Sequence, residues 1–319
     1  MKNKNISTII AFILILILLM VLVYISEVNY ENNNKNEIFG NIGLDSSELN
    51  ILFFDVGQAE SILITNNGES MLIDCGEPSD GKYVATFLKE QGINELDYLI
   101  GTHIDNDHVG GMKNVLKEIT VDNLYMPYCT YFDKVFYKDL DKYLSSKSNF
   151  GNIKSGDMKI EMSLEQEYTL GDAVWRCLYV DNSNPQRDEN FNNTSIVIEL
   201  TYEDTKYLFM GDIENNIDSK IPGLSDIDVL KVAHHGAEET TSDDFLSIVK
   251  PEYAIISAGD YDNYDHPNEK TIQRLKDFQI LDENIHITRY HGTIWLRSDG
   301  SNINIMQKND LDLDGAYRH

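Results

Sequence analysis

The stretch GTHIDNDHVGG, residues 101–111, places two histidines and two aspartates within six positions. It continues the apolar run LDYLIGT, which predicts a buried strand that ends where the polar loop begins. In sheets covered by helices, binding residues gather beyond the carboxyl ends of the strands. Alternation along the chain puts His103, Asp105 and Asp107 on one side, with His108 next to Asp107. Four such ligands suit two neighbouring metal ions better than one.

Ligand-type side chains follow three more apolar runs. LFMGD ends in Asp212, and VLKVAHHG contains His234 and His235. YDHP brings His266 into a loop after the run YAIISAG. A solvated turn with capping aspartates would explain one such stretch, but four separate strand ends are hard to attribute to chance. The sequence therefore predicts a hydrolytic metal site built from distant segments.

Composition limits the classes of function. The 319 residues carry a formal net charge of −27, and 42% of them are hydrophobic, which is enough for a sizeable core. The negative charge disfavours a broad electrostatic grip on nucleic acid, although cations in a small site can hold a phosphate locally. The three cysteines, Cys75, Cys129 and Cys177, form no CxxC pair, which argues against a cysteine zinc site. Buried thiols and a single disulfide both stay open.

The two ends of the chain differ from its middle. ISTIIAFILILILLMVLVYI, residues 6–25, is long enough to cross a bilayer as a helix, and the lysines before it favour a cytoplasmic N-terminus. A cleaved signal peptide is the competing interpretation. We expect a single-pass protein of the cell membrane, with its C-terminal domain on the extracellular side. Its expected parts are a transmembrane signal-anchor helix at 1–25, a flexible linker at 26–48, a hydrolase domain at 49–308 and an acidic tail at 309–319.

Short apolar runs alternate with helical patterns in both halves of the chain. Strands are predicted at NILFFDVG, SILITNN, SMLIDCG, LDYLIGTH, AVWRCLYV, TSIVIELTY, KYLFMGD, DVLKVAHHG, EYAIISAG, IHITRY and GTIWLRSDG. Helices are predicted at DGKYVATFLKEQGI, GMKNVLKEI and NEKTIQRLKDF. The segment from about residue 125 to 157 has no clear pattern. The expected fold class is α/β (α+β), with sheets covered by helices.

Seven motifs together carry a family resemblance. THIDNDHVGG, DVGQ, LIDCG, NNTSIVIEL, LFMGDIE, LKVAHHG and DHP are spread over residues 49–300. As a set they resemble the metallo-β-lactamase superfamily, and within it the hydrolase domain at the C-terminus of ComEC-type DNA-uptake competence proteins. The resemblance implies an αββα four-layer sandwich, preceded here by the expected transmembrane helix. It also implies two metal ions in a cleft at one edge of the sheets.

The resemblance also implies a role for each matching residue. His103 and Asp105 would bind one metal ion, Asp107 and His108 the other, and Asp212 would bridge both. His235 matches the last ligand, while His234 more plausibly faces the substrate, with the reverse assignment left open. The candidate catalytic residues are His234, His266 and Asp107. The candidate supporting or substrate-facing residues are Asp74, Gln58, Asn193 and Lys231, of which Lys231 points either into the cleft or into solvent.

The sequence departs from the superfamily pattern in three places. Asp105 replaces the common second histidine, and FNNTS stands where a further histidine is usual, so that Asn192, Asn193, Ser195 or a water would take its place. The first metal ion then has more oxygen ligands, which shifts preference from zinc towards manganese or magnesium. DVGQAES carries alanine and glutamate where this branch usually has glycine and aspartate. We expect two divalent ions, Zn²⁺ or Mn²⁺.

The expected activity is metal-dependent hydrolysis of a phosphodiester, with single-stranded DNA as a candidate substrate. Two alternatives stay open. The substrate could be a small phosphoester, such as a phosphorylcholine-type decoration, or the fold could serve as a binding module that has lost its chemistry. The expected partners are the phosphodiester and, through the N-terminal helix, the membrane; no protein partner is predictable.

Overall fold

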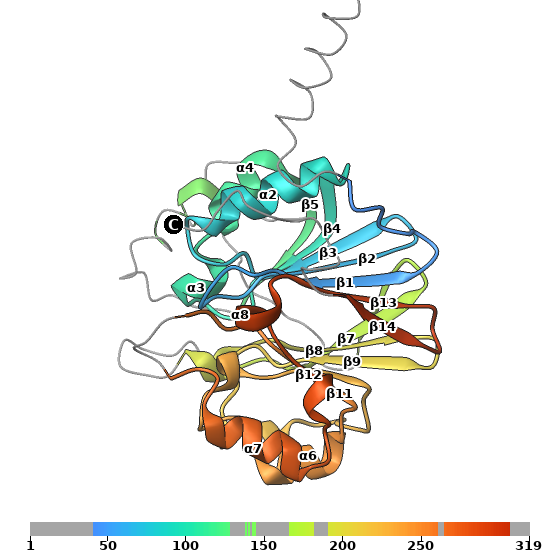
Figure 1. Cartoon of the computed structure of the whole chain (residues 1–319). Coiled ribbons are helices and arrows are strands. Elements are labelled where there is room, and N and C mark those ends of the chain that lie inside the picture. Colours follow the sequence, from blue (N-terminus) through green and yellow to red (C-terminus); the bar gives the residue numbers. More distant parts are fainter. Residues whose placement is uncertain are drawn as a thin grey trace, which may run out of the picture.

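Two seven-stranded sheets lie face to face at the centre of the structure, a computed structural model that describes residues 41–127, 138, 140, 142–144, 166–181, 191–260 and 265–306 (Figure 1). The first sheet has the strand order β14-β13-β1-β2-β3-β4-β5, and the second has the order β12-β11-β10-β9-β8-β7-β6. The strands of the first sheet are β1 (Leu49–Phe53), β2 (Ile62–Asn66), β3 (Glu69–Ile73), β4 (Glu95–Ile100), β5 (Thr120–Tyr125), β13 (Ile294–Ser298) and β14 (Ile303–Met306). Those of the second sheet are β6 (Glu167–Leu170), β7 (Ala173–Tyr179), β8 (Val197–Tyr202), β9 (Thr205–Phe209), β10 (Val229–Lys231), β11 (Tyr253–Ile256) and β12 (Ile285–Ile287).

Helices cover the outer face of each sheet (Figure 1). On the first sheet lie α2 (Asp80–Glu90) and α4 (Met112–Glu118), and on the second lie α6 (Asp243–Val249) and α7 (Glu269–Asp277). The helices are crossover connections, because β3, β4 and β5 pair in parallel, as do β9, β10, β11 and β12. The short helices of the described residues are α3 (Asn106–Val109), α8 (Thr288–His291), η1 (Asn192–Thr194), η2 (Asp218–Lys220), η3 (His234–Gly236) and η4 (Asp282–Asn284).

The core follows from these layers. All five residues of β1 are buried, because one face of this strand packs on the helix layer and the other on the second sheet. Phe53 of β1 and Phe209 of β9 meet across the sandwich, with ring centroids 6.3 Å apart. A second apolar cluster lies under α6 and α7, where Phe245 and Leu275 pack on the outer face of the second sheet. The predicted αββα sandwich is therefore confirmed.

The predicted strands and helices correspond to observed elements, with some changes at their ends. The strand predicted at IHITRY stops at Ile287, because α8 begins at Thr288. The sequence patterns did not single out α6, β5, β6 or β14. Cys75 and Cys177 are buried free thiols, whereas Cys129 lies outside the described residues.

The predicted membrane localisation is corrected by the structure. Within the described ranges, none of the helices has the length and apolar character needed to cross a bilayer. The apolar stretch 6–25, the linker up to residue 40 and the tail 309–319 lie outside the described residues.

Candidate metal centre

The candidate metal ligands lie in loops at one edge of the sandwich. Asp74 follows β3 and His103 follows β4, and these two strands are parallel neighbours. Asp212 follows β9 and His235 follows β10, which are parallel neighbours in the other sheet. Parallel neighbours end at the same edge, so each sheet delivers its side chains to the same side of the molecule. The predicted meeting of distant segments is what the structure shows.

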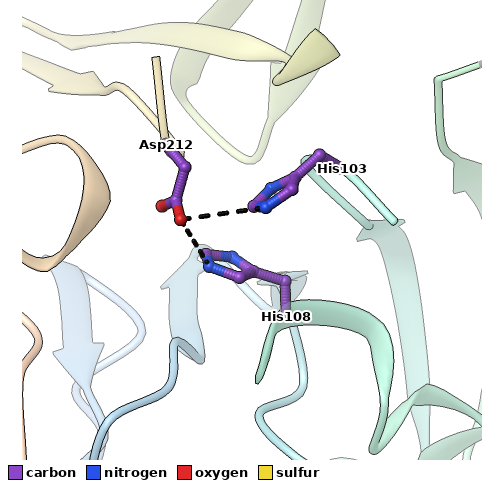
Figure 2. Close-up of side chains that lie close together, drawn as sticks. All are labelled: His103, His108 and Asp212. Carbon is purple, nitrogen blue, oxygen red and sulfur yellow. Dashed lines mark ion pairs between the residues drawn. The ribbon is translucent and has the colours of Figure 1, made fainter. Parts of the chain in front are cut away.

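Asp212 lies at the middle of this cluster. Its Oδ2 atom is 3.2 Å from Nε2 of His108 and 3.8 Å from Nε2 of His103. Figure 2 shows both imidazole rings pointing at the carboxylate. The same oxygen is 3.8 Å from Nε2 of His234 and 3.8 Å from Nε2 of His235. One carboxylate therefore faces four imidazoles, the position expected of a ligand shared by two cations.

Two overlapping sets of three ligand atoms surround this carboxylate. His103, His108 and Asp212 form one set, and Asp107, His108 and His235 form the other; within each set the atoms lie within 4.8 Å of one another. The sequence had grouped His103 with Asp105. In the structure Asp105 Oδ2 is 3.7 Å from His103 Nε2, and the Asp105 side chain is 27% exposed, so it lies at the solvent side of the first set.

Hydrogen bonds to Nδ1 determine which ring nitrogens face the centre. His108 Nδ1 is 2.7 Å from Asp74 Oδ2, so Nδ1 carries the proton. His235 Nδ1 is 2.8 Å from the carbonyl oxygen of Ser257, and the same conclusion follows. These partners use the Nδ1 atoms of both rings and leave Nε2 facing the centre, as the atom that a bound cation would take as its ligand. His235 is thus suited to be the ligand in the pair 234–235.

The third imidazole is oriented through a hydroxyl. Thr102 Oγ1 donates to Asp74 Oδ2 at 2.7 Å, which uses its hydrogen, and lies 3.2 Å from His103 Nδ1. The hydroxyl can therefore only accept from this ring, and the proton of His103 lies on Nδ1. Asp74 also accepts the backbone N–H of Thr102 at 2.8 Å. This carboxylate thus orients His108 directly and His103 through Thr102.

Buried ligand atoms without hydrogen bonds show that the residues fit a cation. Nε2 of His103, His108 and His235 and Oδ1 of Asp212 are buried, and none has a hydrogen-bond partner among the described residues. Carboxylates are the groups next to two of these nitrogens: Asp212 Oδ2 is 3.2 Å from His108 Nε2, and Asp107 Oδ2 is 3.3 Å from His235 Nε2. Three imidazole nitrogens with carboxylate oxygens from Asp107 and Asp212 make a nitrogen and oxygen donor set that zinc or manganese accepts.

The ionisable groups of the centre strongly influence one another. Burial lowers the pKa of His103 to about 4, and the neighbouring His108 adds to this effect. Burial opposes charge on His108 as well, but the carboxylates of Asp212 and Asp74 raise its pKa well above the usual value. Burial likewise opposes the charge on Asp212, yet His108, His234 and His235 hold its pKa well below the usual range. A proton on His108 therefore partly balances the carboxylates, in the place where a cation would bind.

Unusual backbone conformations bring the ligands close together. His234 and His235 both have positive φ, 47° and 52°, a costly conformation for residues other than glycine. Gly211 also has positive φ, and a Cβ atom there would lie 2.8 Å from Ser195 Oγ. At Gly111 a Cβ atom would lie 2.2 Å from the carbonyl oxygen of Cys75, so only glycine allows this close approach of the two backbone segments.

The segment FNNTS supports the centre in two ways. Ser195 Oγ accepts the backbone N–H of Asp212 at 3.0 Å and lies 3.4 Å from His103 Nδ1. Asn192 Nδ2 lies 3.4 Å from Glu214 Oε1 and 3.5 Å from His234 Nδ1. The hydrogen bonds of Asn193 go elsewhere, to the backbone N–H of Glu214 and to the side chain of Asn216. The sequence pointed to this segment because FNNTS stands where the superfamily usually has a histidine.

Two of the predicted residues have partners that the sequence did not reveal. Lys231 points neither into a cleft nor into solvent: it is fully buried and forms an ion pair with Glu60, which is also fully buried. The backbone N–H of Glu60 donates to the carbonyl oxygen of Asp107 at 3.0 Å, so this ion pair adjoins the metal loop. Gln58 contacts His266, with Nε2 and Nδ1 3.2 Å apart.

Comparisons with known proteins agree with this architecture. Residues 54–143 match the model of the metallo-beta-lactamase superfamily. ComE operon protein 3 of Bacillus subtilis is 29% identical over 274 residues, which cover 79% of this chain and 33% of that protein. Recombination protein 2 of Haemophilus influenzae is 30% identical over 243 residues, which cover 73% of this chain and 27% of that protein. Competence protein ComA of Neisseria gonorrhoeae is 26% identical over 262 residues, which cover 79% of this chain and 31% of that protein.

The chain spans about a third or less of the length of these curated relatives. Its similarity to all three extends over more than two thirds of its own residues. The resemblance to the metallo-β-lactamase superfamily and to competence proteins, expected from the ordered motifs, is therefore confirmed.

Proposed function

We propose that this chain, whose residues 54–143 belong to the metallo-β-lactamase superfamily, is a metal-dependent phosphodiesterase. Members of this superfamily are generally metal-dependent hydrolases. The observation that carries the proposal is the convergence of three buried imidazole Nε2 atoms on Asp212. A cation between these imidazoles and the carboxylates of Asp212 and Asp107 would satisfy all of these buried groups at once.

The residues named above would hold two divalent cations, Zn²⁺ or Mn²⁺. His103, His108, Asp212, Asp107 and His235 supply ligand atoms, with Asp105 at the solvent side. Divalent cations in such a site activate water for attack and neutralise charge on a phosphoryl group.

His234 is the candidate for substrate contact. Its side chain is 20% exposed, whereas that of His235 is 2% exposed, so His234 lies between the centre and solvent. The Asn192 amide nitrogen lies next to the Glu214 carboxylate, which only accepts, and the same nitrogen faces His234 Nδ1. That ring nitrogen therefore accepts, and the proton of His234 lies on Nε2. His234 can donate a hydrogen bond to a phosphoryl oxygen.

The net charge of −27 favours a short substrate over long duplex DNA. We therefore propose phosphodiesters of limited length, with single-stranded DNA oligonucleotides as the first candidates. Small phosphoesters are the second candidate, because no broad basic surface is needed to bind them.

The test is metal analysis of the purified protein followed by a substrate screen. The screen compares a short single-stranded oligonucleotide, bis(p-nitrophenyl) phosphate and p-nitrophenyl phosphorylcholine, each with Mn²⁺ and with Zn²⁺. We expect bound metal and turnover of a phosphodiester. Asp212→Ala should abolish both metal binding and turnover, because it removes the shared carboxylate.

The control is Asp228→Asn. Asp228 accepts the backbone N–H of Lys206 at 2.7 Å just before β10 begins, at the opposite end of that strand from His235. This variant should keep both properties. Full activity in Asp212→Ala would refute the metal assignment, and a wild type with neither bound metal nor turnover would identify a binding module.

A further inference from the structure

The hydrogen bonds of Gln58 determine which ring nitrogen of His266 carries the proton. Gln58 Oε1 is 3.1 Å from the backbone nitrogen of Gly259, which can only donate. This contact fixes the orientation of the amide, so the amide nitrogen Nε2 is the atom that lies 3.2 Å from His266 Nδ1. An amide nitrogen also only donates. His266 Nδ1 is therefore an acceptor, and the ring proton lies on Nε2.

This tautomer is opposite to that of the metal-centre histidines. In His103, His108 and His235 Nδ1 carries a proton, because Thr102, Asp74 and Ser257 accept it, and Nε2 is the atom that faces the centre. A neutral His266 with its proton on Nε2 cannot ligate a metal through that atom. It can donate a hydrogen bond from it.

The structure holds the His266 ring beside the centre. Its centroid is 5.2 Å from that of His234 and 6.3 Å from that of His235. Arg289 donates to the carbonyl oxygen of His266 through Nη2 and to that of Gly259 through Nε at 2.8 Å. Gly259 and His266, the two residues that the Gln58 side chain contacts, are thereby both held by one arginine on α8. In Figure 1, α8 and α3 lie at the same end of the sandwich.

We propose that Gln58 is a positioning residue that holds His266 as a hydrogen-bond donor to the phosphoryl group of the substrate, and not as a metal ligand or a proton acceptor. The choice of substrate rests on the proposed function, but the tautomer does not. In a neutral ring whose Nδ1 accepts from Gln58, Nε2 carries the proton and is the atom that can donate to a substrate oxygen.

Nitrogen-15 NMR of the histidine rings tests the tautomer directly, without substrate. In the wild-type protein, two-bond proton–nitrogen correlations should show His266 protonated on Nε2. In Gln58→Glu the side chain has no N–H to donate, so its second oxygen should accept from His266 and move the proton to Nδ1. In Gln58→Met neither hydrogen bond forms, and both tautomers should be present. A wild-type His266 protonated on Nδ1 would overturn the proposal.

Kinetics test the role of the donor. With bis(p-nitrophenyl) phosphate, Gln58→Glu should lower kcat by about 10²-fold, the usual effect of losing one donor to a transition-state oxygen. Gln58→Met should lie between this variant and the wild type. Affinity for Mn²⁺, titrated separately, should fall by less than about 3-fold, because His266 is not a ligand.

The matched control is Gln91→Glu. Gln91 also accepts a backbone N–H, that of Ile42 at 2.9 Å, but it lies at the end of α2, away from the centre. This variant carries the same change of charge and should behave as wild type. If Gln58→Glu also has wild-type kcat, the proposal is wrong.

A separate measurement covers the case in which no phosphodiester is turned over. The proposed function would then fail, and binding of inorganic phosphate to the Mn²⁺-loaded protein would still test the donor. Gln58→Glu should bind phosphate about 10-fold more weakly than Gln91→Glu, the effect of losing one hydrogen bond to a charged group. Equal affinities would overturn the proposal.

Discussion

Replacing Asp74 by asparagine should weaken both metal binding and the fold. Asp74 is completely buried and accepts three hydrogen bonds: 2.8 Å from Thr102 N, 2.7 Å from Thr102 Oγ1 and 2.7 Å from His108 Nδ1. The asparagine amide offers one oxygen in place of two. Its NH₂ group must face at least one donor, either Thr102 N–H or the Nδ1–H of His108.

The expected magnitude follows from these contacts. Loss of a carboxylate that holds a ligating histidine typically lowers metal affinity 10- to 100-fold. Both His108 and, through Thr102, His103 depend on Asp74, so we expect the upper part of this range, about 2–3 kcal/mol. The unpaired donor should also lower the free energy of unfolding of the metal-free protein by about 1–3 kcal/mol.

The assay is competition of the protein with a chromophoric chelator for Mn²⁺ and Zn²⁺, combined with urea unfolding of the metal-free protein. Asp218→Asn is the matched control. Asp218 is also completely buried and accepts three hydrogen bonds, from Ser242 N, Ser242 Oγ and Ser219 N. It should lose similar stability and retain metal affinity. Equal affinities in the two variants would refute the link from Asp74 through the imidazoles to the cation.

Two further predictions concern buried groups. Glu60→Met leaves the buried ammonium of Lys231 without a counter-charge and should lower the free energy of unfolding by about 3–5 kcal/mol. In urea unfolding, the double variant Glu60→Met/Lys231→Met should recover most of this loss. A double variant no more stable than Glu60→Met would contradict the prediction. Burial, with help from His291, lowers the pKa of His286 to about 4, so between pH 6.5 and pH 4 the unfolded chain takes up a proton that the folded chain does not. The free energy of unfolding should therefore decrease as the pH is lowered from 6.5 to 4. In His286→Gln this decrease should be smaller by about 2 kcal/mol. Identical pH profiles for the two proteins would count against the buried neutral ring.

The layers of the fold could be predicted because the apolar runs are long and clearly interrupted. β1 and β8 each come from a run that is buried on both faces over nearly its whole length. α6 was harder to see, because its seven residues carry only Phe245, Leu246 and Val249 as buried positions, too few for a helical period. The strand predicted at IHITRY extends past its observed end because Thr and Tyr are common in strands, although here they belong to α8.

The candidate site could be predicted only as a set of residue types at strand ends. Sequence patterns locate His103, His108 and Asp212, since each follows an apolar run. They do not show which partner meets each Nδ1 atom, because Asp74 and Ser257 lie in segments that approach these rings only in the folded chain. The pairing of Lys231 with Glu60 was hidden for the same reason.

The division of the ligands between the two sheets has a consequence for the persistence of the protein. His103, Asp107 and His108 belong to one half of the sandwich, and Asp212 and His235 to the other. An ion bound between the two halves of the sandwich would link them. It would also lower the population of partly opened forms, which are the forms that proteases cleave. At a free concentration one hundred times its Kd, it would add about 2.7 kcal/mol against unfolding. A shortage of that ion would then make the protein more susceptible to proteolysis, in addition to removing its proposed activity.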